Sequence, residues 1–476
     1  MLSLVAFRQR FHSAEAEALA ARRAVAASSL NTLPKGGKST QRTQQAAAVG
    51  DVVSAANAFL ATLSATQTGS TTTSQTGTVL QPFSAANVIK WSNFPIAGYQ
   101  GRIGIRFDAL TATQRTAALA VIQAATGTAA GEGFDEIQQI RAADDWLVNN
   151  GSSSATFSSN YYFIAFLGQP STTGTWMLQC GGHHSATNIT FGSGNVTGVS
   201  PKFEGVEPLT YSAINSSVLP TGTACAPINQ EQSTMLALLN GLTTAQKTTA
   251  KLSQSFGDVV VGPQKDGQFP ATKVGLSCSQ LTAAQQQLVV NAMATWVKDA
   301  DDATGTQLLD YYQSQLAGTY LAYSGTGNIN TNGDYVRLDG PNVWIEFIVQ
   351  TGAEIKTQVH YHTLYRDRAR DYGGNFYGSY TTVLGTRASA TGSTAATVFT
   401  AFPNPVASGQ GIDVVLTQTT QLASYLLRNS LGQTVVSGTF SGVMAKVPTV
   451  GLSAGTYLLT VQPSGEQPVT SRLTLQ

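Results

Sequence analysis

Hydrophobic positions recur at helical spacing in some stretches and as short continuous runs in others, and the two patterns follow in the same order twice. In the first half, they predict helices over residues 110–122 and 133–147, then strands over 161–168, 176–180 and 189–191. The second half predicts helices at 232–240, from 243, from 281 and at 311–316, then strands at 319–323, 334–338, 343–349 and 358–365. The helix starts at 110–114 (LTATQ) and 281–285 (LTAAQ) are alike. We therefore predict an α+β domain whose helix–hairpin core is internally duplicated in a pseudo-twofold arrangement.

Changes in composition divide the chain into four segments. Residues 1–78 form an N-terminal helical and low-complexity segment, ending in a Ser/Thr/Gly tract that is typical of a loop. Within this segment, helices are expected at 1–31 and 51–63, with a linker at 31–50. Residues 79–385 form the predicted α+β domain, and residues 386–399, mostly Ala, Ser, Thr and Gly, form a linker. Short alternating strands between Gly and Pro turns over 400–476 predict a small all-β sandwich.

The composition excludes some classes of partner. Charged residues make up 11% of the chain and the net charge is +1, against a usual charged fraction of ~25%. So neutral a surface argues against nucleic acid or an anionic membrane as the main partner. No apolar run approaches the ~20 residues of a membrane-spanning helix. Ser, Thr, Gln, Asn and Gly carry the polarity instead, which is typical of an exported protein.

The three cysteines are too few for a disulfide framework. A single bridge between Cys225 and Cys278 would fit an oxidising compartment. Cys180, three residues before His183, would then be left either as a thiolate ligand or as a buried free thiol.

Four of the five histidines lie in two short clusters. His360 and His362 fall on a predicted strand, where side chains at i and i+2 share a face. Such a pair is a good two-ligand set for Zn or Cu, and its alternative is a hydrogen-bonded pair beneath a loop. His183 and His184 are adjacent, so on a regular strand they face opposite ways, and we expect His184 to be the inward one. All four are candidate metal ligands.

Carboxylates and one arginine are candidates to complete this site. Glu346 lies mid-strand in an apolar run, where an unpaired charge is costly. It is therefore either a ligand or general base, or part of a buried ion pair with Arg337 or Arg366. Arg366 either binds a substrate carboxylate or phosphate or belongs to a salt-bridged rim. We take Glu346 and Arg366 as candidate catalytic residues, and Glu204 and Glu207 as further carboxylates whose alternative is a solvated loop.

A distinctive set of residues runs through the middle of the chain. It comprises Trp176, Gly182-His183-His184, Asn188, Pro201, Phe203, Gly205, Glu207-Pro208, Trp344-Ile345-Glu346-Phe347, His360-Tyr361-His362, Arg366-Asp367 and Asp371-Tyr372-Gly373. With these residues, the stretch from about 79 to 372 resembles the uncharacterised family DUF3500. The resemblance implies one domain around both histidine clusters and names no reaction.

A second set of residues follows at the C-terminal end. It comprises Phe402-Pro403-Asn404-Pro405, YLLRNSLGQ at 425–433, LSAGTYL at 452–458 and SRLTL at 471–475. In order and spacing, this segment is similar to the type A C-terminal sorting domain of the type IX secretion system. The resemblance implies that the type IX machinery recognises residues 400–476 and carries the chain to the outside or the outer-membrane surface. Such proteins need a signal peptide, which residues 1–11 do not supply, so we expect the true start to lie upstream.

These observations predict a secreted or cell-surface bacterial protein with a histidine-lined metal cleft. The metal, Zn or Cu, would activate water for hydrolysis or support oxygen chemistry on a small-molecule or polymer substrate. The alternative from another class is a non-catalytic surface-binding protein whose histidines are structural. A third reading is acid–base catalysis by histidine and Glu346 without a metal.

Overall fold

The computed structural model describes residues 38–98, 101–377, 399–407, 409–429, 434–464 and 469–476. The chain divides into two compact units, Met1–Arg387 and Ala388–Gln476. The helix expected at 1–31 and most of the linker expected at 386–399 lie outside the described residues. The two units are therefore described separately.

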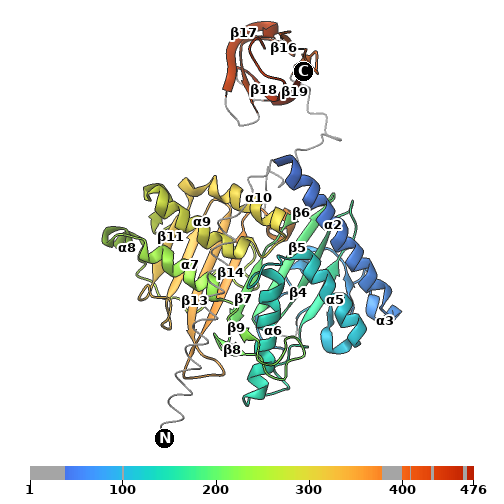
Figure 1. Cartoon of the computed structure of the whole chain (residues 1–476), viewed down its shortest axis with the longest axis vertical. Coiled ribbons are helices and arrows are strands. Elements are labelled where there is room, and N and C mark those ends of the chain that lie inside the picture. Colours follow the sequence, from blue (N-terminus) through green and yellow to red (C-terminus); the bar gives the residue numbers. More distant parts are fainter. Residues whose placement is uncertain (1–37, 99–100, 378–398, 408, 430–433, 465–468) are drawn as a thin grey trace. The chain divides into compact units, whose positions relative to one another are not determined.

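A twelve-stranded sheet forms the middle of the first unit (Figure 1). Its strands run in the order β1 (Leu80–Gln81), β3 (Phe163–Leu167), β4 (Trp176–Gly182), β5 (Ser185–Gly192), β7 (Lys202–Val206), β14 (Val359–Asp367), β13 (Val343–Thr351), β12 (Tyr335–Asp339), β11 (Tyr320–Ser324) and β10 (Leu276–Ser277). β2 (Ile105–Arg106) pairs with β3, and β6 (Asn195–Gly198) pairs with β5. Two antiparallel meanders, β3–β4–β5 and β11–β12–β13–β14, thus meet through β7 near the centre of the sheet.

Helices cover one face of this sheet, as Figure 1 shows. They are α2 (Lys38–Ala61), α5 (Ala112–Ala125), α6 (Gly133–Asn149), α7 (Asn229–Asn240), α8 (Thr244–Ala250), α9 (Ala283–Val297) and α10 (Asp302–Gln313). Three of them begin with a capping box, in which a threonine at the N-cap and a glutamine three residues later exchange hydrogen bonds. These threonines are Thr111, Thr243 and Thr282. The boxes fix where the predicted helices start.

Loops cover the opposite face of the sheet. Trp91 from the loop before β2, Val261 from the loop after α8, and Tyr372 after β14 pack there against strand residues. These strand residues include Phe203 of β7 and Leu364 of β14, both fully buried. Because His360 and His362 alternate with the same period as Leu364, they lie on this loop-covered face.

The N-terminal boundary differs from the expectation. α2 begins at Lys38, inside the stretch expected as a linker, and its Val52 and Phe59 are buried in the main core. The Ser/Thr/Gly tract is also held in place, because the Gln81 side chain donates to the carbonyl oxygens of Gln75 and Thr78. The boundary expected at residue 79 therefore falls inside the first unit. The helix expected at 51–63 is therefore present but starts earlier, because tertiary packing, which a polar pattern does not reveal, stabilises the preceding residues as helix.

The bridge considered between Cys225 and Cys278 is not present, and of the two alternatives for Cys180 the buried free thiol is the one found. Cys180, Cys225 and Cys278 are all buried and free. Cys225 belongs to a small separate hairpin of β8 (Tyr211–Ser212) and β9 (Ala224–Cys225), whereas Cys278 follows β10 at the edge of the large sheet. Burial raises the pKa of the Cys180 thiol to about 12, which keeps it protonated and unsuited to binding a metal as a thiolate.

The second unit is all-β. Its strands are β15 (Phe399–Phe402), β16 (Ile412–Arg428), β17 (Thr434–Val447), β18 (Gly455–Pro463) and β19 (Val469–Leu475). β17 pairs along one edge of β16, while β15 and then β18 share its other edge. The sheet curls over buried apolar residues such as Val414, Leu427 and Leu459. The α+β class is confirmed, whereas the internal duplication stays a prediction.

Candidate metal centre

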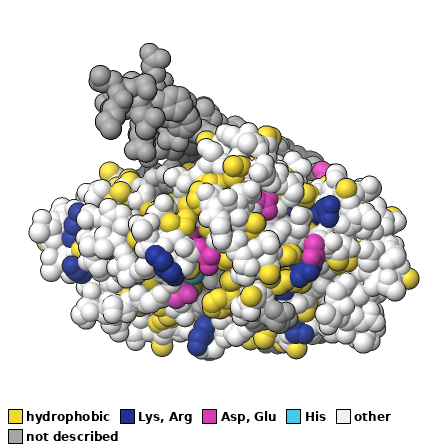
Figure 2. All heavy atoms as spheres, turned by 90° about the horizontal axis from the view of Figure 1, so that it is seen from below, with side chains coloured by type: hydrophobic (Ala, Val, Ile, Leu, Met, Phe, Trp, Pro, Cys, Tyr) yellow, Lys and Arg dark blue, Asp and Glu magenta, His cyan; other side chains and the backbone are white. Residues whose placement is uncertain are grey.

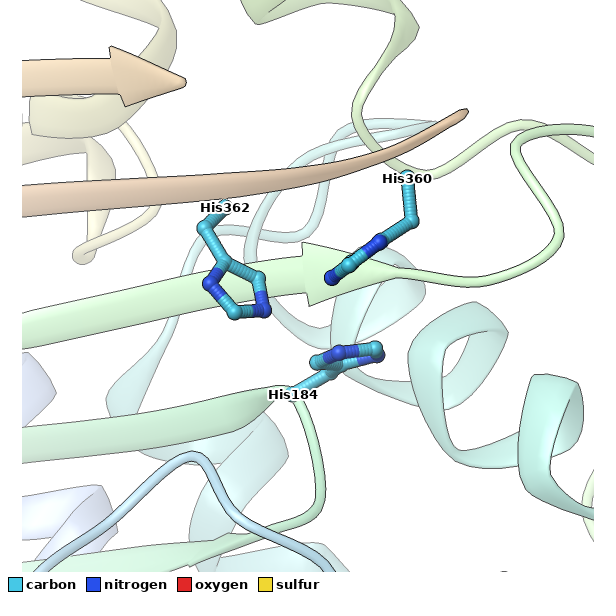
Figure 3. A group of neighbouring side chains, drawn as sticks. All are labelled: His184, His360 and His362. Carbon is cyan, nitrogen blue, oxygen red and sulfur yellow. The ribbon is translucent and has the colours of Figure 1, made fainter. Parts of the chain in front are cut away.

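Three imidazoles from distant parts of the sequence converge at one end of the large sheet (Figure 3). The ring centroids of His184 and His360 are 5.6 Å apart, those of His184 and His362 are 5.1 Å apart, and those of His360 and His362 are 4.8 Å apart. One nitrogen from each ring lies within 4.8 Å of the other two, close enough for the trio to hold one ion. We call these three residues the histidine trio.

Strand β14 supplies two members of the histidine trio, as expected from its period. His362 lies opposite Ile348 of β13 on one side and opposite Gly205 of β7 on the other. Gly205 is a spacer between the rings. A Cβ at this position would lie 3.0 Å from Cδ2 of His362 and 3.1 Å from Cδ2 of His184. Any larger residue would push the two imidazoles aside.

His184 reaches the histidine trio from a tight turn, which corrects the expectation that it lies on a regular strand. His183 and His184 are the two residues between β4 and β5, where Gly182 pairs with Ser185. His184 has φ = 59°, a left-handed conformation that histidine adopts more readily than most residues. Its N–H donates to the carbonyl of Asn93 at 2.9 Å, and its carbonyl accepts from Gly205 at 2.8 Å. These bonds fix the turn against two neighbouring segments.

Hydrogen bonds orient both β14 imidazoles. Nδ1 of His360 donates to the carbonyl of Thr351 at 2.9 Å. Nδ1 of His362 lies 2.9 Å from a carboxylate oxygen of Asp258, which accepts from it. With Nδ1 engaged, Nε2 of each ring carries the lone pair and is the atom free to bind a metal.

Burial favours the neutral form of two members of the histidine trio, His184 and His360. Burial, reinforced by the neighbouring imidazoles, holds the pKa of His184 well below its ordinary value. Burial and His362 lower the pKa of His360 to about 4. A metal ligand must be an unprotonated imidazole. At neutral pH, both rings are already in that form.

His183 lies beside the histidine trio without joining it. Its ring stacks on His184 at 3.8 Å between centroids, and its Nδ1 lies 2.6 Å from a carboxylate oxygen of Asp144. Phe157 covers it from the side, at 5.0 Å between centroids. The structure thus brings together three of the four expected ligands and pairs the fourth with a carboxylate.

Glu346 is fully buried and fully engaged. Its two oxygens accept from the backbone N–H groups of Val260 at 2.5 Å and Val261 at 3.0 Å, from the Tyr335 hydroxyl at 2.8 Å and from Nε1 of Trp344 at 2.6 Å. Burial raises the pKa of Glu346, against the effect of these hydrogen bonds. Val260 and Val261 follow Asp258 in the same loop, so Glu346 anchors the loop that orients His362.

Arg366 lies farther along β14. Four residues of strand, about 13 Å, separate it from His362. Its guanidinium pairs with Asp371 at 2.8 Å and Asp266 at 3.0 Å, and it is fully buried. The expected salt-bridged cluster is present, but it lies in the interior of the unit.

Two positioning carboxylates were not anticipated in these roles. The sequence around Asp258 does not indicate its role, because only the folded chain brings it next to His362, which lies 104 residues later. Glu207, expected in a solvated loop, is buried and accepts from the N–H groups of Ala353, Glu354 and Ile355 in the turn between β13 and β14. That turn leads directly into the strand that carries His360.

Seen from below, this side of the unit carries acidic and basic side chains close together among apolar ones (Figure 2).

One comparison with known proteins identifies the body of the chain. A family profile described as "Protein of unknown function (DUF3500)" matches residues 45–374. No curated protein matches the chain. One similar solved structure is PorZ, an essential bacterial surface component of the type-IX secretion system of Porphyromonas gingivalis. It is 10% identical, the match covers 33% of this chain and 16% of that chain, and the TM-score is 0.16. This chain therefore spans a small part of that protein, and so low a score carries no argument about fold or partners.

Proposed function

Because the chain belongs to the DUF3500 family of proteins of unknown function, its activity has to be inferred from its own side chains, and we propose that the histidine trio is a catalytic metal site. The observation that carries this proposal is the convergence of three imidazoles, one from the turn at residue 184 and two from β14. Three histidines leave a fourth coordination position for water or substrate. A metal held this way lowers the pKa of bound water towards neutrality and turns it into a nucleophile.

The geometry suits Zn or Cu. Three metal–nitrogen bonds of about 2.0–2.1 Å keep their nitrogens roughly 3.3 Å apart, so small side-chain rotations close the trio on an ion. Imidazole suits both metals. Zn would support hydrolysis and Cu would support oxygen chemistry, on a small-molecule or polymer substrate.

The remaining candidates take supporting roles in this proposal. Asp258 fixes the tautomer of His362, and Glu346 positions the loop that carries Asp258. Glu346 accepts four hydrogen bonds, so we assign it to positioning rather than to proton transfer. The ion pairs of Arg366 likewise assign it to holding the interior of the loop-covered face. His183, stacked on His184, is a lateral support for the trio.

We also propose that residues 400–476 direct export by the type IX secretion machinery to the outside or the cell surface. The support is the sequence resemblance in this segment and its folding as a separate compact unit. Within the described residues, no helix is both long enough and apolar enough to cross a bilayer. A fusion of this segment to a fluorescent reporter behind a signal peptide tests the proposal in a bacterium that has the machinery. Export that does not depend on the segment contradicts it.

Activity measurements test the metal proposal. The chelated protein should be inactive on a panel of chromogenic ester, amide and phosphoester substrates, or on oxidisable phenols. Zn or Cu should restore activity in the wild type and not in His362→Ala. Activity that resists the chelator points instead to acid–base catalysis without metal. The absence of bound metal, together with melting that chelator leaves unchanged, points to a non-catalytic surface-binding protein.

A further inference from the structure

A second charged cluster lies on the helix-covered face of the same sheet. It consists of Glu136 in the first turn of α6, Lys202 and Glu204 on β7, Glu231 in the first turn of α7, and Asp299 just after α9. All five residues are 97% buried or more. Glu204 pairs with Thr363, whereas the adjacent Gly205 pairs with His362. Neighbours on a strand point to opposite faces, so this cluster lies across the sheet from the histidine trio.

We propose that this carboxylate cluster is a binding site for one hard divalent cation, of the class of Mg²⁺, Mn²⁺ or Ca²⁺. Oxygen atoms of Glu136, Glu204 and Asp299 lie within 4.8 Å of one another, which is the spacing that a shared ion requires. Carboxylate oxygens are the ligands that such ions prefer. The site is separate from the histidine trio and does not depend on it.

The charges in the cluster do not balance without a further cation. Within the described residues, Lys202 is the one basic side chain of the carboxylate cluster. Nζ of Lys202 contacts Glu204, lies 2.5 Å from Asp299 and lies 3.5 Å from Glu136. One ammonium therefore faces four carboxylates in a fully buried space, where uncompensated charge is expensive. A divalent ion would bring the balance close to neutral.

The oxygens that accept no hydrogen bond are the ones that a metal would use. The two oxygens of Asp299 each have one partner, the N–H of Gly133 at 2.7 Å and Nζ of Lys202 at 2.5 Å, and each keeps a lone pair that could bind the ion. Within the described residues, no hydrogen-bond donor reaches either oxygen of Glu136 or Oε2 of Glu204 and Glu231. Buried polar atoms of this kind ordinarily have a partner. The unpartnered oxygens of Glu136 and Glu204 belong to two of the three residues whose oxygens lie within 4.8 Å of one another, and the buried cluster adds the unpartnered Oε2 of Glu231.

The electrostatics of the cluster agree with this assignment. Burial, and then the neighbouring carboxylates, hold the pKa of Glu136 and Glu231 well above the ordinary value. Burial raises the pKa of Asp299 to about 7, although Lys202 opposes the change. These directions mean that the buried site disfavours the ionised form of its carboxyl groups, which a bound cation would favour.

Titration of the full-length chain with Mn²⁺ tests the proposal. The chelated protein should remove about one equivalent of Mn²⁺ from the electron paramagnetic resonance signal of the free ion, and Ca²⁺ or Mg²⁺ should compete for it. The thermal midpoint should rise by a few degrees with each of these ions. His362→Ala should respond like the wild type, so loss of the histidine trio and loss of this cluster are distinguishable.

Glu136→Gln and Glu231→Gln should each abolish the Mn²⁺ binding, and Asp310→Asn, which changes an exposed carboxylate, should not. If neither glutamine variant folds, the wild-type titration still decides. No Mn²⁺ bound by the wild type means that the cluster holds only protons and overturns the proposal. Mn²⁺ binding that survives in both folded glutamine variants overturns it as well.

Discussion

The hydrogen bond between Nδ1 of His362 and the carboxylate of Asp258 joins a central strand residue to a loop residue 104 positions earlier in the chain. It fixes the orientation of one imidazole and leaves Nε2 free for a metal. Carboxylates that orient ligating histidines in this way typically contribute 10–100-fold to metal affinity. Burial works to raise the pKa of Asp258, but the hydrogen bonds that it accepts from His362 and from the N–H of Val259 help to outweigh burial, so the pKa lies below the ordinary value.

Asp258→Ala should weaken metal binding while leaving the fold intact. The Asp258 side chain is 44% exposed, so its removal opens no cavity in the core. We expect the dissociation constant for Zn to rise by about 10–100-fold, with little change in the thermal midpoint of the chelated protein. Isothermal titration calorimetry measures the first quantity, and Asp310→Ala is the control for loss of an exposed carboxylate. An unchanged dissociation constant would remove Asp258 from the site.

Glu346→Gln separates a positioning role from a catalytic one. A glutamine amide cannot accept all four hydrogen bonds that the carboxylate accepts, and its N–H₂ group meets buried donors. We expect the free energy of unfolding to fall by about 3 kcal/mol, as measured in urea. Amide hydrogen exchange should accelerate at one of Val260 and Val261, because their N–H groups donate to different oxygens of Glu346 and glutamine keeps only one of them. A variant with native stability and native exchange but no activity would instead make Glu346 the general base.

Gly205→Ala tests the spacing of the imidazoles. The new Cβ would lie 2.8 Å from the carbonyl oxygen of Tyr361 as well as against both rings. Overpacking of this kind costs about 1–3 kcal/mol, and metal affinity should fall because the rings move apart. Gly50→Ala is the matched control, since nothing lies within 4 Å of its added Cβ in helix α2. A Gly205→Ala protein with unchanged metal affinity would show that the spacer is not needed.

The pair of Asp371 and Arg366 predicts a dependence of stability on pH. Burial raises the pKa of Asp371 to about 6, although Arg366 opposes the change. Between about pH 4 and pH 6, the folded protein therefore binds more protons at this site than the unfolded chain, whose aspartate pKa is about 3.9. The contribution of Asp371 to stability is present below pH 4 and is lost as the pH rises through 6.

Asp371→Asn removes this titration. Relative to the variant, the wild type should lose up to about 3 kcal/mol between pH 4 and pH 7, measured by urea unfolding at each pH. The comparison uses the change of the free energy of unfolding with pH, so a pH-independent difference caused by the lost ion pair does not affect it. A wild-type advantage that grows with pH would mean that Arg366 dominates over burial.

Local patterns predicted the parts of the site that local geometry determines. The period of a strand places His360 and His362 on one face, and it does so whatever surrounds the strand. The burial of Glu346 followed from its apolar neighbours, but its partners did not, since two are backbone N–H groups from a loop 86 and 85 residues away. The alternation of a regular strand predicts His184 as the inward histidine of its pair, but His184 does not lie on a strand. It joins the trio because a two-residue turn aims it there, and not because it alternates along a strand.

Features that depend on long-range packing could not be read from the chain. The carboxylate cluster takes residues from α6, β7, α7 and the end of α9, and none of them stands in a motif. Glu204 and Glu207 flank Gly205 in sequence and were expected in a solvated loop. Both are buried, because β7 is a central strand between β5 and β14. The strand's position in the sheet decides their environment, and a single sequence does not show it.

Measuring the metal content of the protein is the sharpest test of the histidine trio as a metal site. Full-length chain, chelated, reloaded with Zn or Cu and desalted, should hold about one equivalent by elemental analysis. His184→Asn, which tolerates the left-handed turn, and His362→Ala should each lose that metal, whereas His183→Asn should retain it. The absence of stoichiometric metal from the wild type, or equal retention by all three variants, would contradict the proposal that His184, His360 and His362 together hold an ion.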